Sequence, residues 1–133
     1  MPAFDSNGVS IHYEVFGENG KPPIVLVHGF AASLDGNWVR PGWIETLTPL
    51  RQVVALDCRG HGESEKPYDA EAYGDNMPDD VIRLMDHLNI EKADLFGYSM
   101  GSRISTRLMT AHPEDGWLLW PAAEREVAGR KLP

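Results

Sequence analysis

The stretch that most constrains the fold of this chain is Gly97-Tyr98-Ser99-Met100-Gly101, which fits the pattern Gly-x-Ser-x-Gly. A serine framed by two glycines can occupy a tight turn between a strand and a helix, because residues without a β-carbon tolerate a close approach of the two elements. Such a turn would expose the serine hydroxyl above the edge of a sheet. The same five residues also suit an ordinary loop, so the flanking sequence decides between the two interpretations.

The flanking sequence favours the turn between strand and helix. Residues 93–98 form a short apolar run of the kind found in buried parallel strands. After the motif, Ile104, Leu108 and Ala111 recur at helical spacing, and Pro113 ends the run. The sequence therefore predicts a strand, a sharp turn and an amphipathic helix around the serine.

Two further apolar runs and one turn signal predict the rest of the sheet. Asn7-Gly8 is a strong signal for a hairpin turn, and the alternation of apolar and polar residues beside it predicts an antiparallel hairpin over residues 4–17. The continuous apolar runs 24–27 and 52–56 are typical of strands that helices cover on both faces.

Helical patterns follow both runs. One helix is predicted to begin near Trp38, with Pro41 in its first turn and three inward-facing residues, Trp43, Leu47 and Leu50. The next is predicted to begin near Asn76 and carries one apolar stripe: Met77, Val81, Leu84, Met85 and Leu88. Strands that alternate with helices imply right-handed crossovers. The predicted fold class is α/β, with a doubly wound, mostly parallel sheet and an antiparallel N-terminal hairpin.

Three landmarks in this order resemble the α/β-hydrolase family. His28-Gly29-Phe30 follows the first apolar run, the segment 57–64 (DCRGHGES) follows the second, and the serine motif follows the third. The resemblance covers residues 1 to about 113, roughly the first half of a family member. We therefore expect residues 1–113 to form the amino-terminal part of a hydrolase domain, an incomplete α/β-hydrolase fold, and residues 114–133 to form a non-family tail.

The resemblance implies a serine hydrolase that acts on an ester, lactone or related acyl bond. Ser99 would be the nucleophile, and the backbone N–H groups of Phe30 and Met100 would form the oxyanion hole. Amides at a helix start favour negative charge on physical grounds as well. The resemblance also implies a set of site-shaping residues: His28, Gly29, Gly97, Tyr98 and Gly101. A serine disfavours the halide- and epoxide-cleaving branches of the family, which use an aspartate at this position.

In the family, the acid and the histidine base both follow the serine by a long interval. The candidates that follow Ser99 here are His112, Glu114, Asp115, Glu124 and Glu126. A helix from the serine to His112 would place that histidine about 20 Å away, at the opposite edge of the sheet. His87 ends the preceding helix, and His12 lies in the hairpin. His28 and His61 lie at the correct edge, where the family uses them to shape loops. We therefore expect a chain without the acid and the base, and with little activity.

Other conspicuous side chains have mainly structural interpretations. Asp57, at a strand end, is expected to organise its loop. Cys58 is expected to be buried as a packing residue. Trp38, Trp43 and Tyr98 would either line a pocket or belong to the core.

Composition limits the partners of the chain. The 133 residues carry a formal net charge of -8, without the clustered Lys and Arg that phosphate binding needs. No run approaches the roughly 18 apolar residues of a membrane span, and the first residues lack a secretory pattern. The single cysteine excludes an internal disulfide, and no His/Cys spacing resembles a zinc site. We expect a cytoplasmic protein that binds a small-molecule acyl substrate and no cofactor, metal, nucleic acid or membrane.

Three explanations of such a chain remain open. It could be a hydrolase truncated or shifted in frame near Glu114. It could be a non-catalytic fragment that binds small acyl compounds or a partner chain through an open sheet edge. It could also be an enzyme completed by a second chain. Self-association of the isolated chain through the incomplete sheet is expected, because only residues 117–120 could pair with the outer edge of strand 93–98.

Overall fold

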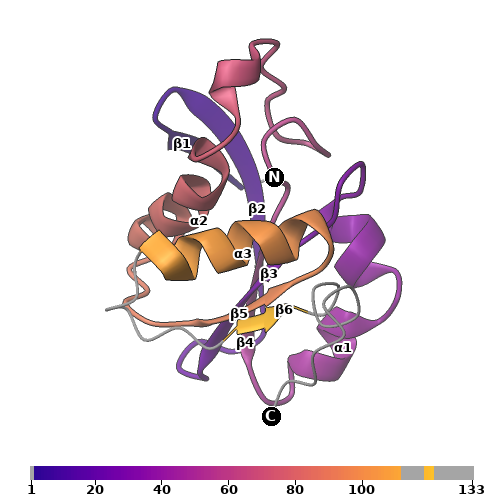
Figure 1. Ribbon diagram of the computed structural model, residues 1–133. Helices are drawn as coiled ribbons and strands as arrows, with labels where there is room; N and C mark the ends of the chain where they lie inside the picture. The colour runs from indigo at the N-terminus through magenta and orange to yellow at the C-terminus, as the bar shows by residue number, and fades with distance from the viewer. Residues whose placement is uncertain (1, 112–118, 122–133) are drawn as a thin grey trace.

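The computed structural model describes residues 2–111 and 119–121, which form one mixed sheet with helices on both faces (Figure 1). The strands are β1 (Ala3–Ser6), β2 (Val9–Phe16), β3 (Pro23–Val27), β4 (Gln52–Leu56), β5 (Asp94–Gly97) and β6 (Leu119–Pro121). The helical segments are η1 (Asp35–Val39), α1 (Trp43–Leu47), η2 (Ala70–Ala72), α2 (Asn76–His87) and α3 (Met100–Ala111). None of these helices is long and apolar enough to cross a membrane.

The strand order across the sheet is β1-β2-β4-β3-β5-β6. β3 is parallel to both β4 and β5, and β6 is parallel to β5, whereas β2 pairs with β1 and β4 in antiparallel fashion. The hairpin turns at Asn7 and Gly8, whose left-handed φ angles of 53° and 94° are those that a two-residue turn requires. The mostly parallel sheet with its antiparallel hairpin is therefore confirmed. The carboxyl ends of β3, β4 and β5 meet at one edge, where such sheets bind ligands.

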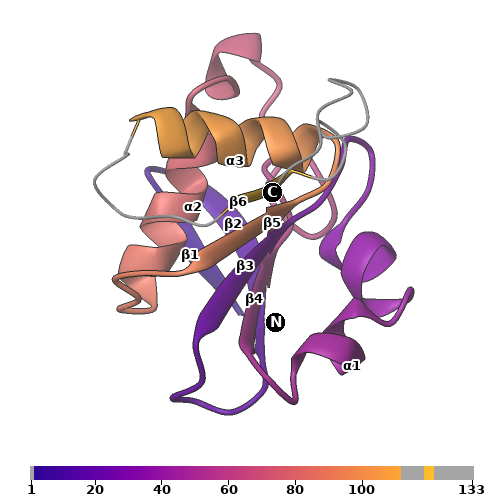
Figure 2. The same ribbon diagram turned by 60° about the horizontal axis from the view of Figure 1, so that its bottom comes forward.

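Each face of the sheet has its own core, because successive residues of a strand point to opposite faces. α2 and α3 cover one face over Val25, Val54 and Leu95, and η1 and α1 cover the other over Leu26 and Val53 (Figure 2). The apolar stripe predicted for α2 lies in the first core. Three of its residues are buried and two pack beside them: Val81, Leu84 and Met85, then Met77 and Leu88.

The single helix predicted to begin near Trp38 is wrong. A π-helical turn, η1, and a five-residue helix, α1, replace it, and Gly42 between them has a left-handed φ of 95°. The break rotates the following residues, so that Trp43 is 40% and Leu50 73% exposed while Ile44 is buried. Of the three residues predicted to face inward, only Leu47 packs against the core with its side chain largely covered.

The predicted boundary at residue 113 lies outside the described residues, as do the candidates His112, Glu114, Asp115, Glu124 and Glu126. Within the predicted tail, the described residues 119–121 form β6 beside β5, where part of residues 117–120 was expected to pair.

Candidate functional site

Ser99 lies in the short turn between β5 and α3, at the carboxyl edge of the sheet. β5 ends at Gly97 and α3 begins at Met100, so the predicted strand, sharp turn and helix are all present. The residue is exposed, and its φ of 55° is left-handed, which is uncommon for a residue with a β-carbon. A serine in such a turn presents its hydroxyl to a substrate rather than to the core.

Gly97 and Gly101 allow the start of α3 to lie directly on the sheet. A β-carbon on Gly97 would lie 2.3 Å from the carbonyl oxygen of Gly101, and one on Gly101 would lie 1.9 Å from the carbonyl oxygen of Val27. Both distances are far shorter than any real contact, so no other residue fits at either position unless the backbone moves. The glycines of the motif are therefore required by the packing around Ser99.

The loop after β3 lies beside the Ser99 turn. The Tyr98 N–H donates to the carbonyl oxygen of Val27 at 3.1 Å, which continues the pairing of β3 with β5. A β-carbon on Gly29 would lie 3.3 Å from the Cβ of Ser99 and 3.1 Å from the Tyr98 ring. The loop thus approaches the serine through a residue without a side chain, and Phe30 follows immediately with 77% of its surface exposed.

The amides of Phe30 and Met100 have the properties that oxyanion donors need. Met100 is the first residue of α3, and the first N–H groups of a helix have no acceptor within it. Among the described residues, no acceptor pairs with either amide. The positive end of the α3 dipole adds to the attraction of negative charge at this point. The role of the two amides as oxyanion donors stays a prediction.

His28 is fully buried at the end of β3 and engages both ring nitrogens. The Cys58 N–H donates to Nε2 at 2.9 Å, so Nδ1 carries the proton and donates to the carbonyl oxygen of Gly29 at 2.7 Å. Burial lowers the pKa of His28 from 6.5, because desolvation penalises the charged ring more than the Gly29 bond favours it. A neutral histidine with both nitrogens engaged is a poor base, which agrees with its expected role in shaping the loop.

Asp57 ties together the loops that follow β3 and β4. One carboxylate oxygen accepts from the Leu34 N–H and the other from the Glu63 N–H, both at 2.9 Å. The backbone of Gly62, which has a left-handed φ of 51°, approaches the Asp57 side chain so closely that a β-carbon on it would lie 2.3 Å from the carboxyl carbon. Backbone amides therefore hold both oxygens, as expected of a residue that organises its loop.

His61 and Cys58 complete the contacts between the two loops. The His61 ring centroid lies 5.1 Å from that of His28 and 5.7 Å from that of Phe30, and its Nδ1 lies 3.1 Å from the carbonyl oxygen of Arg59. Burial and nearby carboxylates raise the pKa of the Cys58 thiol. The thiol is therefore protonated and packs in the core, as expected.

Of the three aromatic residues considered for a pocket, only Tyr98 lies at the serine. Trp38 is buried, and its ring centroid is 5.4 Å from that of Phe96. Trp43 packs on the same phenylalanine at 5.0 Å. Both tryptophans thus lie on the face of the sheet that η1 and α1 cover. Tyr98, in contrast, is half-exposed, and its ring lies beside Gly29.

Two side-chain interactions near the site could not be predicted from the sequence pattern. The Asn37 Oδ1 accepts from the Gly29 N–H at 2.8 Å and so anchors the loop after β3. Arg59 lies buried and binds Asp80 of α2 through two hydrogen bonds of 2.7 and 2.6 Å. Neither the apolar stripe of α2 nor the segment 57–64 predicts this buried pair.

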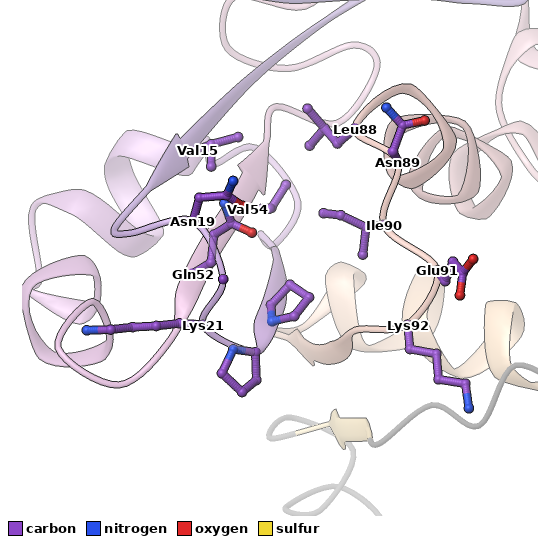
Figure 3. Close-up of a pocket in the computed structure, with 13 residues that line it drawn as sticks. Val15, Asn19, Lys21, Gln52, Val54, Leu88, Asn89, Ile90, Glu91 and Lys92 are labelled. Carbon is purple, nitrogen blue, oxygen red and sulfur yellow. The ribbon is translucent and has the colours of Figure 1, made fainter.

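No candidate for the acid or the base of a triad follows Ser99 in the described structure. The described residues after it contain no histidine, aspartate or glutamate. No group of three metal-ligating side chains is arranged to hold a metal ion within residues 2–111 and 119–121. A cavity of about 560 Å³ is lined by residues between Val15 and Lys92 (Figure 3), but it lies at the amino ends of β3 and β4, opposite the serine.

Comparisons with known proteins agree with this geometry. A sequence model of the α/β-hydrolase fold family matches residues 22–115. The chain is 41% identical over 104 residues to the dihydrolipoyllysine-residue acetyltransferase component of the acetoin cleaving system of Pseudomonas putida, covering 77% of this chain and 26% of that protein. It is 35% identical over 112 residues to epoxide hydrolase 4 of Mus musculus, covering 81% and 30%.

Solved structures give the same result. The enol-lactonase from Burkholderia xenovorans LB400 superposes with a TM-score of 0.77 at 32% identity, covering 86% of this chain and 43% of the lactonase. The chain thus spans from about a quarter to two fifths of the length of these proteins.

Proposed function

The chain belongs to the α/β-hydrolase family, and from this membership we propose that it supplies the nucleophile and the oxyanion donors of a serine hydrolase. The bond to be cleaved is an ester, a lactone or a related acyl bond. The observation that carries the proposal is the Ser99 turn, in which an exposed serine with a φ of 55° lies between two glycines that admit no β-carbon and beside the loop of Gly29.

The proposed reaction begins with attack of the Ser99 oxygen on the carbonyl carbon of the substrate. As the new O–C bond forms, the carbonyl π electrons move onto the carbonyl oxygen. The N–H groups of Phe30 and Met100 then donate to that oxygen, and each such donor is worth about 10² to 10³ in rate in a water-excluded site. Collapse of the intermediate expels the alcohol portion, which takes up the proton that the serine lost, and leaves an acyl-serine that water hydrolyses to the carboxylic acid and free Ser99.

The serine proton has to pass to a base within about 3 Å of the hydroxyl. His28 is engaged at both nitrogens, and His61 contacts the rings of His28 and Phe30 while its Nδ1 lies 3.1 Å from the carbonyl oxygen of Arg59. His12 is buried on β2, which β4 and β3 separate from β5, and its Nδ1 lies 3.0 Å from the carbonyl oxygen of Pro2. His87 lies at the end of α2. We infer that the base and its orienting acid come from outside the described residues, either on this protein or on a partner chain.

The identity of the nucleophile favours acyl chemistry over epoxide opening. Similar proteins include an epoxide hydrolase and an enol-lactonase. A carboxylate nucleophile opens an epoxide through an ester intermediate, whereas a serine acts on carbonyl compounds. Because residue 99 is a serine, we assign the chain to the acyl-cleaving side of the family.

A second candidate is a non-catalytic chain that binds small acyl compounds or a partner chain through its open sheet edge. This candidate is favoured by β6, which has three residues and is the last strand of the described sheet. Its outer edge would offer unpaired N–H and C=O groups to a strand from another chain.

The test is the binding of 4-fluorophenylboronic acid, followed by ¹⁹F NMR at mildly alkaline pH. The Ser99 oxygen adds to boron, its proton passes to the buffer, and the anionic adduct mimics the tetrahedral intermediate. We expect binding to the unsubstituted chain and to the control Ser10→Ala, which changes an exposed serine of the hairpin. Binding should vanish in Ser99→Ala. Equal binding by Ser99→Ala would refute the nucleophile and favour the second candidate.

A further inference from the structure

A groove runs between α2 and α3, which lie side by side on one face of the sheet (Figure 1, Figure 2). It holds a cavity of about 810 Å³, a volume within the range of small-molecule sites. The start of α2 lines one side of this α2–α3 groove, and α3 residues from Arg103 to Ala111 line the other. Neither Ser99 nor the loop after β3 is among its lining residues in the described structure. The groove is therefore separate from the site proposed above.

The floor of the α2–α3 groove is apolar. Pro78 of α2 and Leu108 of α3 line it, and both are buried against the core beneath the two helices. An adjoining cavity of about 360 Å³ shares Pro78 and Arg103 with the groove and adds Ile104, which is also buried. An alkyl chain that lay on this floor would remove apolar surface from water on both sides of the contact, which favours binding.

The rim of the groove carries two carboxylates and two arginines, and one arginine is unmatched. Asp75 at the start of α2 binds Arg107 of α3 across the groove. Asp79 lies 4.0 Å from Arg83, one turn further along α2. Arg103 is exposed, and no carboxylate of the described residues lies within ion-pair distance of it. One positive charge at the rim is therefore left for a ligand.

A single unmatched arginine selects a particular kind of anion. A carboxylate matches the planar guanidinium of Arg103, because the two can form a pair of parallel hydrogen bonds. A phosphate group carries up to about two negative charges, and Asp75 and Asp79 on the same rim would repel it. The apolar floor adds affinity only for an anion that carries an alkyl chain. The preferred ligand is thus a monoanion with a tail.

We propose that the α2–α3 groove binds a monocarboxylate with an apolar tail, whose head group pairs with Arg103 and whose tail lies along Pro78 and Leu108. The ligand class is a free carboxylic acid of medium chain length. Cleavage of an acyl bond at Ser99 would release acids of this kind. The groove does not depend on that reaction, since none of its lining residues takes part in it.

The test is a titration of the ¹⁵N-labelled 133-residue chain with octanoate, below its micelle concentration, followed by amide chemical shifts. We expect saturable shifts in residues 75–79 and 103–111. Arg103→Gln should weaken binding about fivefold, the upper range for an ion pair that solvent partly screens. Arg103→Lys keeps the charge and should weaken binding less.

The matched control is Arg40→Gln, which removes another exposed arginine, at the end of η1 on the other face of the sheet. It should bind octanoate like the unsubstituted chain. Thermal unfolding of each variant should match that of the unsubstituted chain, because the replaced side chains are exposed. Octanoate affinity that Arg103→Gln leaves unchanged, or that Arg40→Gln lowers equally, would overturn the proposal.

Two further ligands test the head group and the tail without any substitution. Acetate has the carboxylate but no tail, so it should bind at least about tenfold more weakly than octanoate. Inorganic phosphate should bind no more tightly than acetate, because the two rim carboxylates repel it. Equal affinities for acetate and octanoate, or tighter binding of phosphate, would overturn the assignment of the ligand.

The position of the shifts separates this proposal from the proposed function. An oxyanion site also attracts carboxylates, so octanoate could shift the amides of Phe30 and Met100. Shifts confined to those two amides would overturn the groove and leave the proposed function intact. Ser99→Ala should keep its octanoate binding in the groove although it no longer binds 4-fluorophenylboronic acid. Binding of octanoate in the groove by a chain that never bound the boronic acid would support the groove and overturn the proposed function.

Discussion

Gly101 is the residue at which the site is least tolerant of change. A β-carbon there would lie 1.9 Å from the Val27 carbonyl oxygen and 2.8 Å from that of His28, so the start of α3 would have to leave the sheet. We expect Gly101→Ala to lower the free energy of unfolding by about 3 kcal/mol or more, or to prevent folding, as severe overpacking does. Urea unfolding measures the change.

A matched control exists at Gly36, where an added β-carbon would meet only the Ser33 oxygen at an ordinary 3.4 Å. Gly36→Ala should unfold close to the unsubstituted chain. If Gly101→Ala also did so, the close approach of α3 to the sheet would be wrong.

His28 makes the stability of the chain depend on pH. Its pKa is lowered in the folded state, whereas the unfolded chain has the ordinary value of 6.5. Above that value both states are neutral and stability is complete. As the pH falls below it, only the unfolded chain takes up the proton, so the free energy of unfolding falls by up to about 1.4 kcal/mol per pH unit. Urea unfolding at about pH 8 and about pH 5.5 should show a smaller loss in His28→Asn, which cannot titrate. An equal loss in both would contradict a neutral, buried His28.

At the scale of the elements, the Arg59–Asp80 pair joins the loop after β4 to α2. Both side chains are almost fully buried, and Asp80 also accepts a hydrogen bond from Ser6 of β1. Asp80→Asn would leave the Arg59 charge buried without its counter-ion, which typically costs about 3 to 5 kcal/mol. We therefore expect a large loss in urea unfolding.

The control for that pair is Arg107–Asp75, whose side chains are 65% and 70% exposed. Solvent screens such a pair, so Asp75→Asn should leave the unfolding curve unchanged. Similar effects of the two substitutions would show that solvent reaches Arg59 and Asp80.

Elements with a strong local pattern were predictable. The β3 and β4 runs consist of apolar residues that pack on both faces, and the α2 stripe of Val81, Leu84 and Met85 has one helical period. In each case the pattern reports burial against a neighbouring layer, and burial is what stabilises the element.

The segment after β3 was not predictable in detail. Its helix breaks at Gly42, where the backbone adopts a left-handed conformation that neighbouring residues do not reveal. The bond of Asn37 to Gly29 and the pairing of Arg59 with Asp80 join residues 8 and 21 positions apart across loops. Such contacts depend on how loops meet in three dimensions, which hydrophobic periodicity does not encode.

At the scale of the whole molecule, we expect the chain to associate. β6 pairs three residues with β5 and closes the described sheet on that side. A short strand provides few ladder bonds, and an unpaired edge is a template for another strand. Sedimentation velocity over a range of concentrations should show species larger than the monomer. A monomer at all concentrations with a cooperative, reversible melt would contradict the expectation.

The last prediction concerns turnover by the 133-residue chain alone. The described residues provide Ser99 and the Phe30 and Met100 amides but no base for the serine proton, and an unassisted serine is a weak nucleophile. Loss of a triad costs roughly 10⁶ in turnover, and a typical enzyme works at about 10 s⁻¹, so we expect about 10⁻⁵ s⁻¹ on a small activated ester. Rates of the chain and of Ser99→Ala should therefore be nearly equal. Turnover near 1 s⁻¹ that vanished in Ser99→Ala would require a base within this chain, and His61 would be the first residue to replace.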